Sequence, residues 1–412
     1  MLFSHISDTH LGLVQYGSNE REQDVYDVFN QAIDKSIEDN VDFVIFAGDI
    51  FHVPNPNGTA IVQMGNALKR LKENNIDSFF ILGEHDISRI RTTPIPYIYH
   101  NLGFSKYIGN GNPIEYKGIM LAGLDKIRKT EMSQYEEVFS NLDKSVEKFS
   151  GHKILVLHQG ITEFNRFAGE LQSTDLPKNF TYYAMGHLHD KDIKQFNHLK
   201  GPIAYPGSIE LTTSEGIKEI KKGFFEVDIS GDEAIPKWIE LDRRPQFSFD
   251  TDYKELTKTI DKIIEEISDL TKKPIIQVKI QGKDIDTDHI QAQIERLNSL
   301  ALECKWKIIT KQTSDSSVFL DRPNEIEDEI FECMRRSQTL VTGLELNVSS
   351  PNTTGLRVFH EPARLRGLIE ALVAEKQVFR AHSQRAGIAF IDQACGHEIH
   401  GRRTEEPCHE LV

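Results

Sequence analysis

Side chains that can bind metal ions follow five apolar runs of this sequence. The five clusters are Asp8-Thr9-His10, Gly48-Asp49-Ile50-Phe51-His52, Gly83-Glu84-His85-Asp86, His158-Gln159 and Gly186-His187-Leu188-His189. Any one of these histidines, taken alone, would more often be a structural residue with satisfied hydrogen bonds. All five clusters in order, each after a predicted strand, predict one shared metal centre.

The candidate ligands mix imidazole nitrogen with carboxylate oxygen, a donor set that suits Mn²⁺, Fe²⁺ or Zn²⁺ better than Ca²⁺. One ion takes about four to six ligands, so the number of candidates points to two ions that share a carboxylate. Two ions about 3.5–4 Å apart can clamp the attacking and leaving oxygens of a phosphoester. The sequence has no G-x-S-x-G nucleophile motif, so we expect direct in-line attack by water without a covalent intermediate.

The elements that must position these side chains alternate in type over the first 245 residues. Apolar strands are predicted at 2–7, 41–47 and 77–82, and helices with apolar residues on one face at 23–38 and 59–72. This alternation predicts a parallel sheet with covering helices, whose strand ends line a ligand crevice. Further strands are predicted at 119–122, 154–157, 182–185, 203–205 and 224–227, with one helix at 134–148. With so little helix between them, this half is expected to be more antiparallel.

Four segments divide the chain. Residues 1–245 form the metal-binding domain, which ends near the LDRRP sequence at 241–245. Residues 248–312 read as a compact α-β-α-β module. Residues 313–336 are a polar linker and a helix with an apolar face that it cannot bury alone, made of Ile326, Ile330, Phe331 and Met334. Residues 337–412 form a tail for which a helical fold and a foreign origin are both open, since it has one Lys and seven Arg whereas residues 1–336 have 28 Lys and 12 Arg.

These motifs resemble the signature of calcineurin-like metallophosphoesterases. The SDTHLG and GDIFH sequences resemble most the DNA double-strand-break repair nuclease subunits of the meiotic-recombination-eleven and SbcD family, of the archaeal type. The motifs cover about residues 1–240. The resemblance implies an α/β fold, a four-layer α/β/β/α metallophosphoesterase sandwich with a small α+β capping domain at 248–312 that contacts DNA.

Carried over to this sequence, the resemblance implies one metal held by Asp8, His10, Asp49 and His189. It implies a second held by Asp49, Glu84, His158 and His187, with Asp49 as the bridge. His85 would stabilise the transition state or protonate the leaving oxygen, and His52 would position the phosphate. Asp86 would orient His85. The cofactors implied are two Mn²⁺ per subunit, with Mg²⁺, Fe²⁺ or Zn²⁺ as possible substitutes.

Position 84 departs from the family pattern, in which the third motif reads G-N-H-D. Glu84 offers a negative oxygen where asparagine offers a neutral one. A carboxylate would tighten metal binding and make the site less positive toward an anionic phosphate. The alternative is that Glu84 forms a salt bridge beside the ligands.

Partner contacts rest on weaker patterns. Five basic residues in loops after strands are candidate DNA contacts or simply solvated charges: Arg89, Arg91, Lys126, Arg128 and Lys129. The apolar 91–102 segment is part of a homodimer surface or of the core. The helix at 324–336 packs on the tail or, as the resemblance favours, docks on an SMC-like ABC ATPase of the radiation-sensitive-fifty type, paired with a helix at 364–379. Cys395, His397, His400, Cys408 and His409 fit no standard zinc-finger spacing.

Composition sets the class of protein. The 412 residues are 39% hydrophobic and 27% charged, which is typical of globular domains. No apolar run approaches the roughly 20 residues of a membrane span, and four cysteines without a C-x-x-C pair favour a reducing cytoplasm. The net charge of −15 divides into −14 for residues 1–336 and −1 for the tail. Because part of this acidity faces the metals, we expect weak, salt-sensitive DNA binding by the isolated chain.

Together these features predict a Mn-dependent DNA nuclease. By resemblance it is a 3′→5′ exonuclease and single-strand endonuclease that processes double-strand-break ends for homologous recombination, in the cytoplasm with the nucleoid. The alternatives are a phosphodiesterase or phosphatase for small substrates and a non-catalytic scaffold with the same fold. The module at 248–312 argues against the first alternative, and the complete ligand set argues against the second.

Overall fold

A computed structural model describes residues 1–88, 93–127, 135–166, 168–212, 215–282 and 285–309, together with the backbone of three short strands nearer the C-terminus. The chain forms two compact units, Met1–Lys311 and Gln312–Val412. Each unit is described by itself.

The first sheet of the larger unit has six strands in the order β12-β11-β1-β2-β3-β4. Strands β1 to β4 run parallel, and β11 and β12 are antiparallel additions beside β1. Their bounds are β1 Leu2–Ile6, β2 Phe43–Ala47, β3 Asp77–Ile81, β4 Lys106–Tyr107, β11 Gly223–Asp228 and β12 Ile235–Glu240. All five residues of β2 are buried, as expected for a strand covered on both faces.

The second sheet has the order β5-β6-β7-β8-β10-β9. Its four central strands are parallel, and only the edge strands β5 and β9 are antiparallel. The bounds are β5 Ile114–Tyr116, β6 Ile119–Leu124, β7 Lys153–His158, β8 Tyr182–Gly186, β9 Asp192–Lys194 and β10 Ile203–Tyr205. The four later strands that the sequence predicts in this sheet are therefore parallel to one another, and the expected antiparallel pairs occur only at the edges of the sheet. A 3₁₀ turn, η2 (Ser173–Asp175), lies between β7 and β8.

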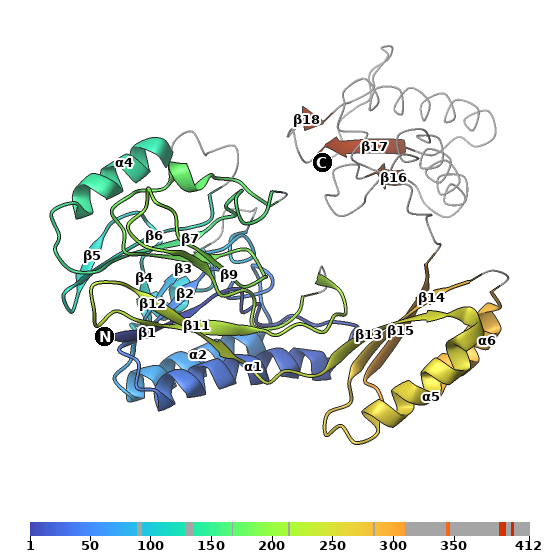
Figure 1. Ribbon diagram of the computed structural model, residues 1–412. Helices are drawn as coiled ribbons and strands as arrows, with labels where there is room; N and C mark the ends of the chain where they lie inside the picture. The colour runs from blue at the N-terminus through green and yellow to red at the C-terminus, as the bar shows by residue number, and fades with distance from the viewer. Residues whose placement is uncertain are drawn as a thin grey trace, which may run out of the picture. The chain divides into compact units, whose positions relative to one another are not determined.

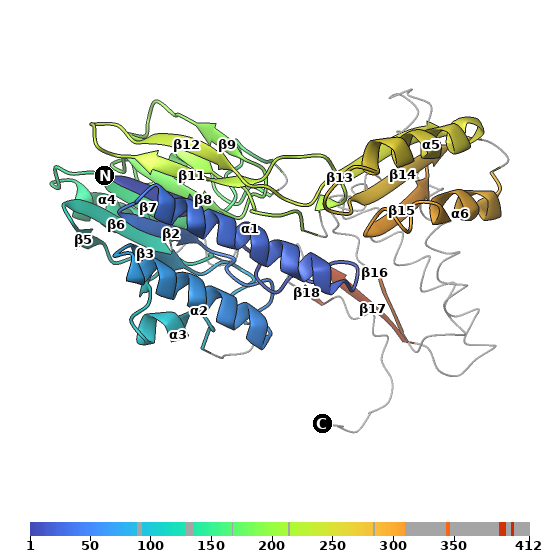
Figure 2. The ribbon, with the colours of Figure 1, turned by 90° about the horizontal axis from the view of Figure 1, so that it is seen from below.

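Helices cover the outer face of each sheet (Figures 1 and 2). Helices α1 (Asn19–Glu38) and α2 (Gly58–Glu73) pack on the first sheet, and α4 (Tyr135–Val146) packs on the second. A third apolar core, which includes Phe3, Phe43 and Val156, fills the space between the sheets. The layers are thus α/β/β/α, and the predicted metallophosphoesterase sandwich is confirmed. A short helix, α3 (Tyr97–Asn101), follows the third motif.

Residues 246–308 have a sheet and a core of their own. Strands β13 (Gln246–Asp252), β14 (Ile275–Gln281) and β15 (Glu303–Ile308) are all parallel, and the sequence pattern missed the first. Helices α5 (Leu256–Ile267) and α6 (Thr287–Glu295) cover one face, and the 3₁₀ turn η4 (Tyr253–Glu255) precedes α5. Arg244 ties this module to the sandwich, since it binds Asp24 through two nitrogens and donates to the Lys273 carbonyl. Its role as a capping domain stays a prediction.

In the smaller unit the structure describes β16 (Gly343–Leu346), β17 (Gly387–Asp392) and β18 (His397–Glu398). Strand β17 pairs parallel with β16 and antiparallel with β18. The predicted docking helix with Ile326, Ile330, Phe331 and Met334, the helix at 364–379 and the side chains of the tail cysteines and histidines lie outside the described residues. Among the described helices, none has the length and apolar character that crossing a membrane requires.

Candidate dimetal site

The five clusters meet where parallel strands of both sheets end. The clusters after β1, β2 and β3 come from neighbouring strands of the first sheet, and those after β7 and β8 come from neighbours in the second. Contacts between β2 and β7 and between β2 and β8 bring the two groups together. The backbone turns sharply here, since Asp8, Asp49 and His187 have φ values of 52°, 50° and 91°. Such strained backbone in non-glycine residues is concentrated at functional sites.

One group of donor atoms comes from Asp8, His10 and His189. The Nε2 atoms of His10 and His189 are 3.2 Å apart, and His189 Nε2 is 3.7 Å from Asp8 Oδ1. Asp49 Oδ2 is 3.9 Å from His10 Nε2, so Asp49 also borders this group. These are the four residues predicted for one metal.

A second group comes from Glu84, His158 and His187. Glu84 reaches both histidines: Oε1 is 3.0 Å from His187 Nδ1, and Oε2 is 3.3 Å from His158 Nε2. Asp49 Oδ2 lies 3.3 Å from the same His158 nitrogen. Asp49 therefore lies between the two groups, where a bridging ligand would be. Asp8 borders both groups as well, at 3.8 Å from His158.

Gly83 and Gly48 allow this close approach. A Cβ atom on Gly83 would lie 2.1 Å from Asp49 Oδ1, and one on Gly48 would lie 2.5 Å from His158 Nδ1. Gly48 also has a φ of +88°, which larger residues rarely adopt.

The free nitrogens of the histidines show that these residues fit a cation. His158 Nδ1 is 2.7 Å from the Ala47 carbonyl and must donate to it, so the fully buried Nε2 is directed at the site, where it faces the carboxylates of Asp49 and Glu84, each at 3.3 Å. His189 Nδ1 is likewise held by Glu215 at 3.1 Å, which leaves its Nε2 for the site. A hydrogen bond on one ring nitrogen that aims the other is the usual support of a metal-binding histidine.

Burial and charge oppose each other among these groups. Burial raises the pKa of Asp8 and lowers that of His10 well below its ordinary value. Burial alone would raise the pKa of Asp49 and lower that of His158, but their mutual attraction outweighs it and shifts both the other way. Burial would also raise the pKa of Glu84, yet its hydrogen bonds with His158 and His187 hold it below the ordinary range. Asp49 and Glu84 are therefore anionic at neutral pH, as cation ligands should be.

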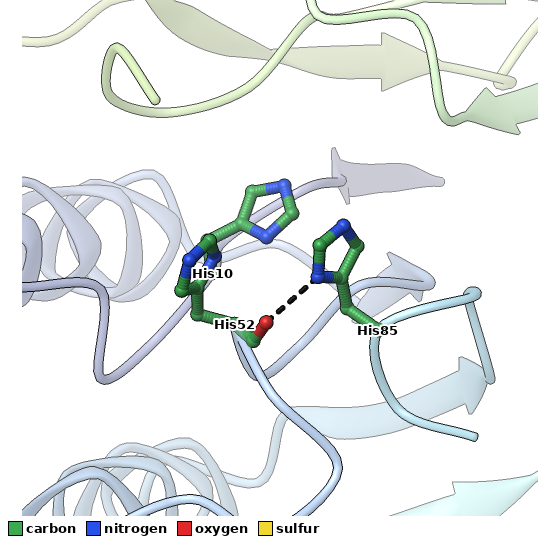
Figure 3. A group of neighbouring side chains, drawn as sticks. All are labelled: His10, His52 and His85. Carbon is green, nitrogen blue, oxygen red and sulfur yellow. Dashed lines mark hydrogen bonds between the residues drawn. The ribbon is translucent and has the colours of Figure 1, made fainter. Parts of the chain in front are cut away.

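His85 and His52 lie next to His10, which belongs to the first group of donor atoms (Figure 3). The His85 ring is 4.9 Å from that of His10 and stacks on that of His52 at 5.4 Å. His85 Nδ1 is 2.7 Å from the His52 carbonyl oxygen, to which it must donate. Its Nε2 is then available to a substrate oxygen, as an acceptor in the neutral ring or as a donor in the protonated ring.

The predicted role of Asp86 is corrected by its hydrogen bonds. Asp86 was expected to orient the His85 ring, but its carboxylate accepts backbone N–H groups of Ile50, Phe51 and Gly83 at 3.0–3.2 Å. Burial, and then the charge of Asp49, raise the pKa of Asp86 to about 7. Asp86 thus fastens the loop of the second motif to that of the third, and the His52 carbonyl holds the His85 ring.

The predicted DNA contacts are described only in part. Arg89, Arg91, Arg128 and Lys129 lie outside the described residues. Lys126 is described, and it lies at the site and not on an open surface: its ammonium is 3.3 Å from Glu84 and 2.8 Å from Glu170.

Sequence reasoning missed the residues that support His189. Glu215 accepts hydrogen bonds from the Thr212 backbone and the Lys222 ammonium as well as contacting His189. Lys222 is 2% exposed and also donates to the His189 carbonyl. In the sequence, Lys222 looks like surface charge within IKEIKKG, and no spacing connects Glu215 to His189.

Comparisons with known proteins agree with this geometry. The family described as calcineurin-like phosphoesterase matches residues 1–191. The protein named DNA double-strand break repair protein Mre11 from Saccharolobus solfataricus is 33% identical over 344 residues, which are 81% of this chain and 89% of that protein. Its namesake from Sulfurisphaera tokodaii is 33% identical over 79% of this chain and 86% of its own length. That from Methanococcus maripaludis is 33% identical over 68% and 78%.

The identity extends over most of the length of these relatives, and the family match at residues 1–191 includes the whole segment that carries the five motifs. The chain therefore belongs to the Mre11 family, and its N-terminal part is a calcineurin-like phosphoesterase domain of the kind that uses divalent metal ions.

Proposed function

We propose that this protein is a two-metal, Mn²⁺-dependent DNA nuclease that processes the ends of double-strand breaks, with 3′→5′ exonuclease and single-strand endonuclease activity. The observation that carries the proposal is the meeting of seven imidazole and carboxylate side chains from five strand ends, with His85 at their edge. The names of the relatives, which are DNA double-strand break repair proteins, support DNA as the substrate. That substrate would place the protein in the cytoplasm with the nucleoid.

In the proposed site, Asp8, His10, Asp49 and His189 hold one ion. Asp49, Glu84, His158 and His187 hold the other. When bound, the ions supply Lewis acidity toward the phosphodiester and toward a water molecule. Mn²⁺ suits this mixed nitrogen and oxygen set, and Mg²⁺, Fe²⁺ or Zn²⁺ are possible substitutes.

The protein's own groups then orient the substrate and move a proton. His85 is held by the His52 carbonyl through Nδ1 and presents Nε2 to the phosphodiester, where it stabilises developing charge or protonates the leaving oxygen. The stacked His52 ring helps to position the phosphate. Asp86 joins the loop that carries His52 to the loop that carries His85, because its carboxylate accepts three backbone N–H groups from them.

The module at 246–308 offers a face for the DNA backbone. Helices α5 and α6 bury one face of its sheet, which carries Ile276, Val278 and Ile280. The strand register places Lys279, Lys305 and Lys307 on the other face. Lysines on a sheet face without helices are suited to phosphate contacts. This supports the role of a DNA-contacting cap, and we propose Arg89, Arg91, Arg128 and Lys129 as further DNA contacts.

One assay separates DNA cleavage from its alternatives. Purified protein with Mn²⁺ is given end-labelled duplex DNA, single-stranded DNA and bis-p-nitrophenyl phosphate. We expect nucleotides to be released from 3′ ends, single strands to be cut, and both activities to be lost in EDTA. Lys279→Glu with Lys307→Glu should slow DNA cleavage and leave the small diester unaffected. Rapid diester hydrolysis without DNA cleavage would indicate a small-substrate phosphodiesterase, and no hydrolysis at all would indicate a scaffold.

We further propose that two copies associate through α2 and α3. Val62 in α2, Ile98 in α3 and Leu102 directly after α3 are 58%, 41% and 63% exposed. The helices are neighbours (Figure 2), since Tyr99 donates to the Ile61 carbonyl. Tyr99 itself is buried, so α3 contributes to the core as well as to this surface.

Replacing Leu102 by glutamate should weaken the dimer about thirtyfold or more, because a charge would enter an apolar interface. Sedimentation equilibrium of the full chain measures the change. Ile235→Glu is the matched control, since Ile235 is also 63% exposed but lies on β12. Equal dissociation constants for the two variants would place the dimer surface elsewhere.

The remaining partner is an SMC-like ABC ATPase, which we propose docks on the helix predicted at 324–336 through Ile326, Ile330, Phe331 and Met334. We expect the full chain to capture such an ATPase, and a chain without residues 320–336 to lose it while it keeps its hydrolysis of bis-p-nitrophenyl phosphate. Capture that survives the deletion would assign docking to another segment.

A further inference from the structure

Lys126 is fixed beside the third motif by its backbone. It follows β6, and its N–H donates to the Leu82 carbonyl at 2.8 Å. In return, the Leu82 N–H donates to the carboxylate of Asp125, which also accepts the Tyr107 hydroxyl. Leu82 is two residues before Glu84, so these bonds hold Lys126 and Glu84 close together.

The side chain of Lys126 points into the cluster of proposed ligands. Its ammonium is 3.3 Å from Glu84 Oε2, 2.8 Å from Glu170 Oε2 and 3.4 Å from both ring nitrogens of His187. The side chain is 10% exposed. Glu170 is itself held in place, since its Oε2 accepts the Gly160 N–H at 3.3 Å. The Lys126 ammonium is thus paired with two carboxylates inside the site and is not an exposed charge that could contact DNA.

We infer that Lys126 is a positioning residue that holds the Glu84 carboxylate and balances its charge in the metal centre. The inference deepens the proposed function and rests on it. Glu84 is the third carboxylate facing the cluster, after Asp8 and Asp49. An anionic phosphodiester would be repelled by that charge, and the ammonium offsets it. The same ammonium competes with a cation for Glu84 Oε2. The Lys126–Glu84 pair therefore lowers metal affinity and at the same time reduces the repulsion of an anionic substrate.

The substitution Lys126→Met tests this because it removes the charge and keeps most of the length. Two shifts of opposite sign are expected. Without its ammonium the metal-free protein should melt at a lower temperature in EDTA. Mn²⁺, measured by isothermal titration calorimetry, should bind about tenfold more tightly, because the ammonium no longer competes with the cation for the Glu84 carboxylate. A residue with only a structural role, or one that only contacts DNA, would not produce both shifts.

The coupling to Glu84 is measured in the Glu84→Gln background. There the gain in Mn²⁺ affinity from Lys126→Met should fall below about threefold, because position 84 no longer carries a carboxylate for the ammonium to release. Lys218→Met is the matched control: Lys218 pairs with Asp190 at 3.7 Å and is 39% exposed, and its loss should leave Mn²⁺ affinity unchanged. Lys126→Arg, which keeps the charge, should retain the wild-type affinity. If the Lys126→Met protein does not fold, Lys126→Gln is used in its place.

Unchanged or weaker Mn²⁺ binding in Lys126→Met would overturn the inference, as would an equal gain in the Glu84→Gln background. In both cases the proposed nuclease function would survive. A wild-type chain that binds no Mn²⁺ would overturn the proposed function and this inference together.

Discussion

Replacement of Asp49 by asparagine is expected to lower phosphodiester hydrolysis by roughly a thousandfold or more, because the shared ligand of both ions loses its charge. Asp49 Oδ2 lies between His10 and His158, at 3.9 and 3.3 Å. Asparagine has the same shape and tolerates the φ of 50° at this position. Its side-chain oxygen can still accept the His85 N–H, which is 2.8 Å from Asp49 Oδ1. The loss would therefore be one of charge and not of folding.

The rate is measured with end-labelled DNA in Mn²⁺, next to thermal unfolding of each protein in EDTA. Asp232→Asn is the control, since Asp232 is an exposed aspartate in the turn before β12. It should keep the wild-type rate. An Asp49→Asn protein that retains more than about a tenth of the rate would show that Asp49 does not bridge the ions.

The His85→Gln variant is expected to lose roughly a hundredfold to a thousandfold in kcat with little change in KM, the usual cost of removing a general acid. The ring is held by the His52 carbonyl and has a free Nε2, and glutamine cannot deliver a proton from that place. Unlike the Asp49 variant, this protein should bind Mn²⁺ as the wild type does.

Mn²⁺ binding must be measured for this variant as well, because a ring nitrogen of His85 lies within 4.8 Å of carboxylate oxygens of Asp49 and Glu84. Those three atoms could themselves hold an ion. Loss of Mn²⁺ together with loss of rate would make His85 a ligand. Loss of rate with full Mn²⁺ binding would support its catalytic role.

Local rules predict the alternating strands and helices and the residues that meet at the site, and the resemblance to metallophosphoesterases implies the four-layer α/β/β/α sandwich. Strands that end in a polar cluster, such as β2 before Asp49, carry their own signal in the apolar run and the turn that follows. Parallel neighbours then bring such ends to one edge. The missed strand β13, QFSFDTD, alternates Phe247, Phe249 and Thr251 with polar residues, so a strand signal is present directly after the predicted boundary at 241–245.

What the sequence could not give is the choice of hydrogen-bond partners. Asp86 follows His85 directly, yet it binds three backbone groups, because the turns of the second and third motifs meet there. Glu215 and Lys222 reach His189 from a loop whose path no periodicity describes. His5 is the opposite case, a histidine close to a motif that does not belong to the site. It is a fully buried histidine in β1, near the first motif, but its ring bonds to Tyr182 and to the Met185 carbonyl within the core.

The most direct test of the two-ion centre is the number of Mn²⁺ ions bound per chain, determined by calorimetric titration of the metal-free protein. Two ions are predicted for the wild type and for His85→Gln, and fewer for Asp49→Asn, which should also lose hydrolysis. A wild type that binds a single ion, or an Asp49→Asn protein that keeps two with unchanged affinity, would contradict the proposed centre.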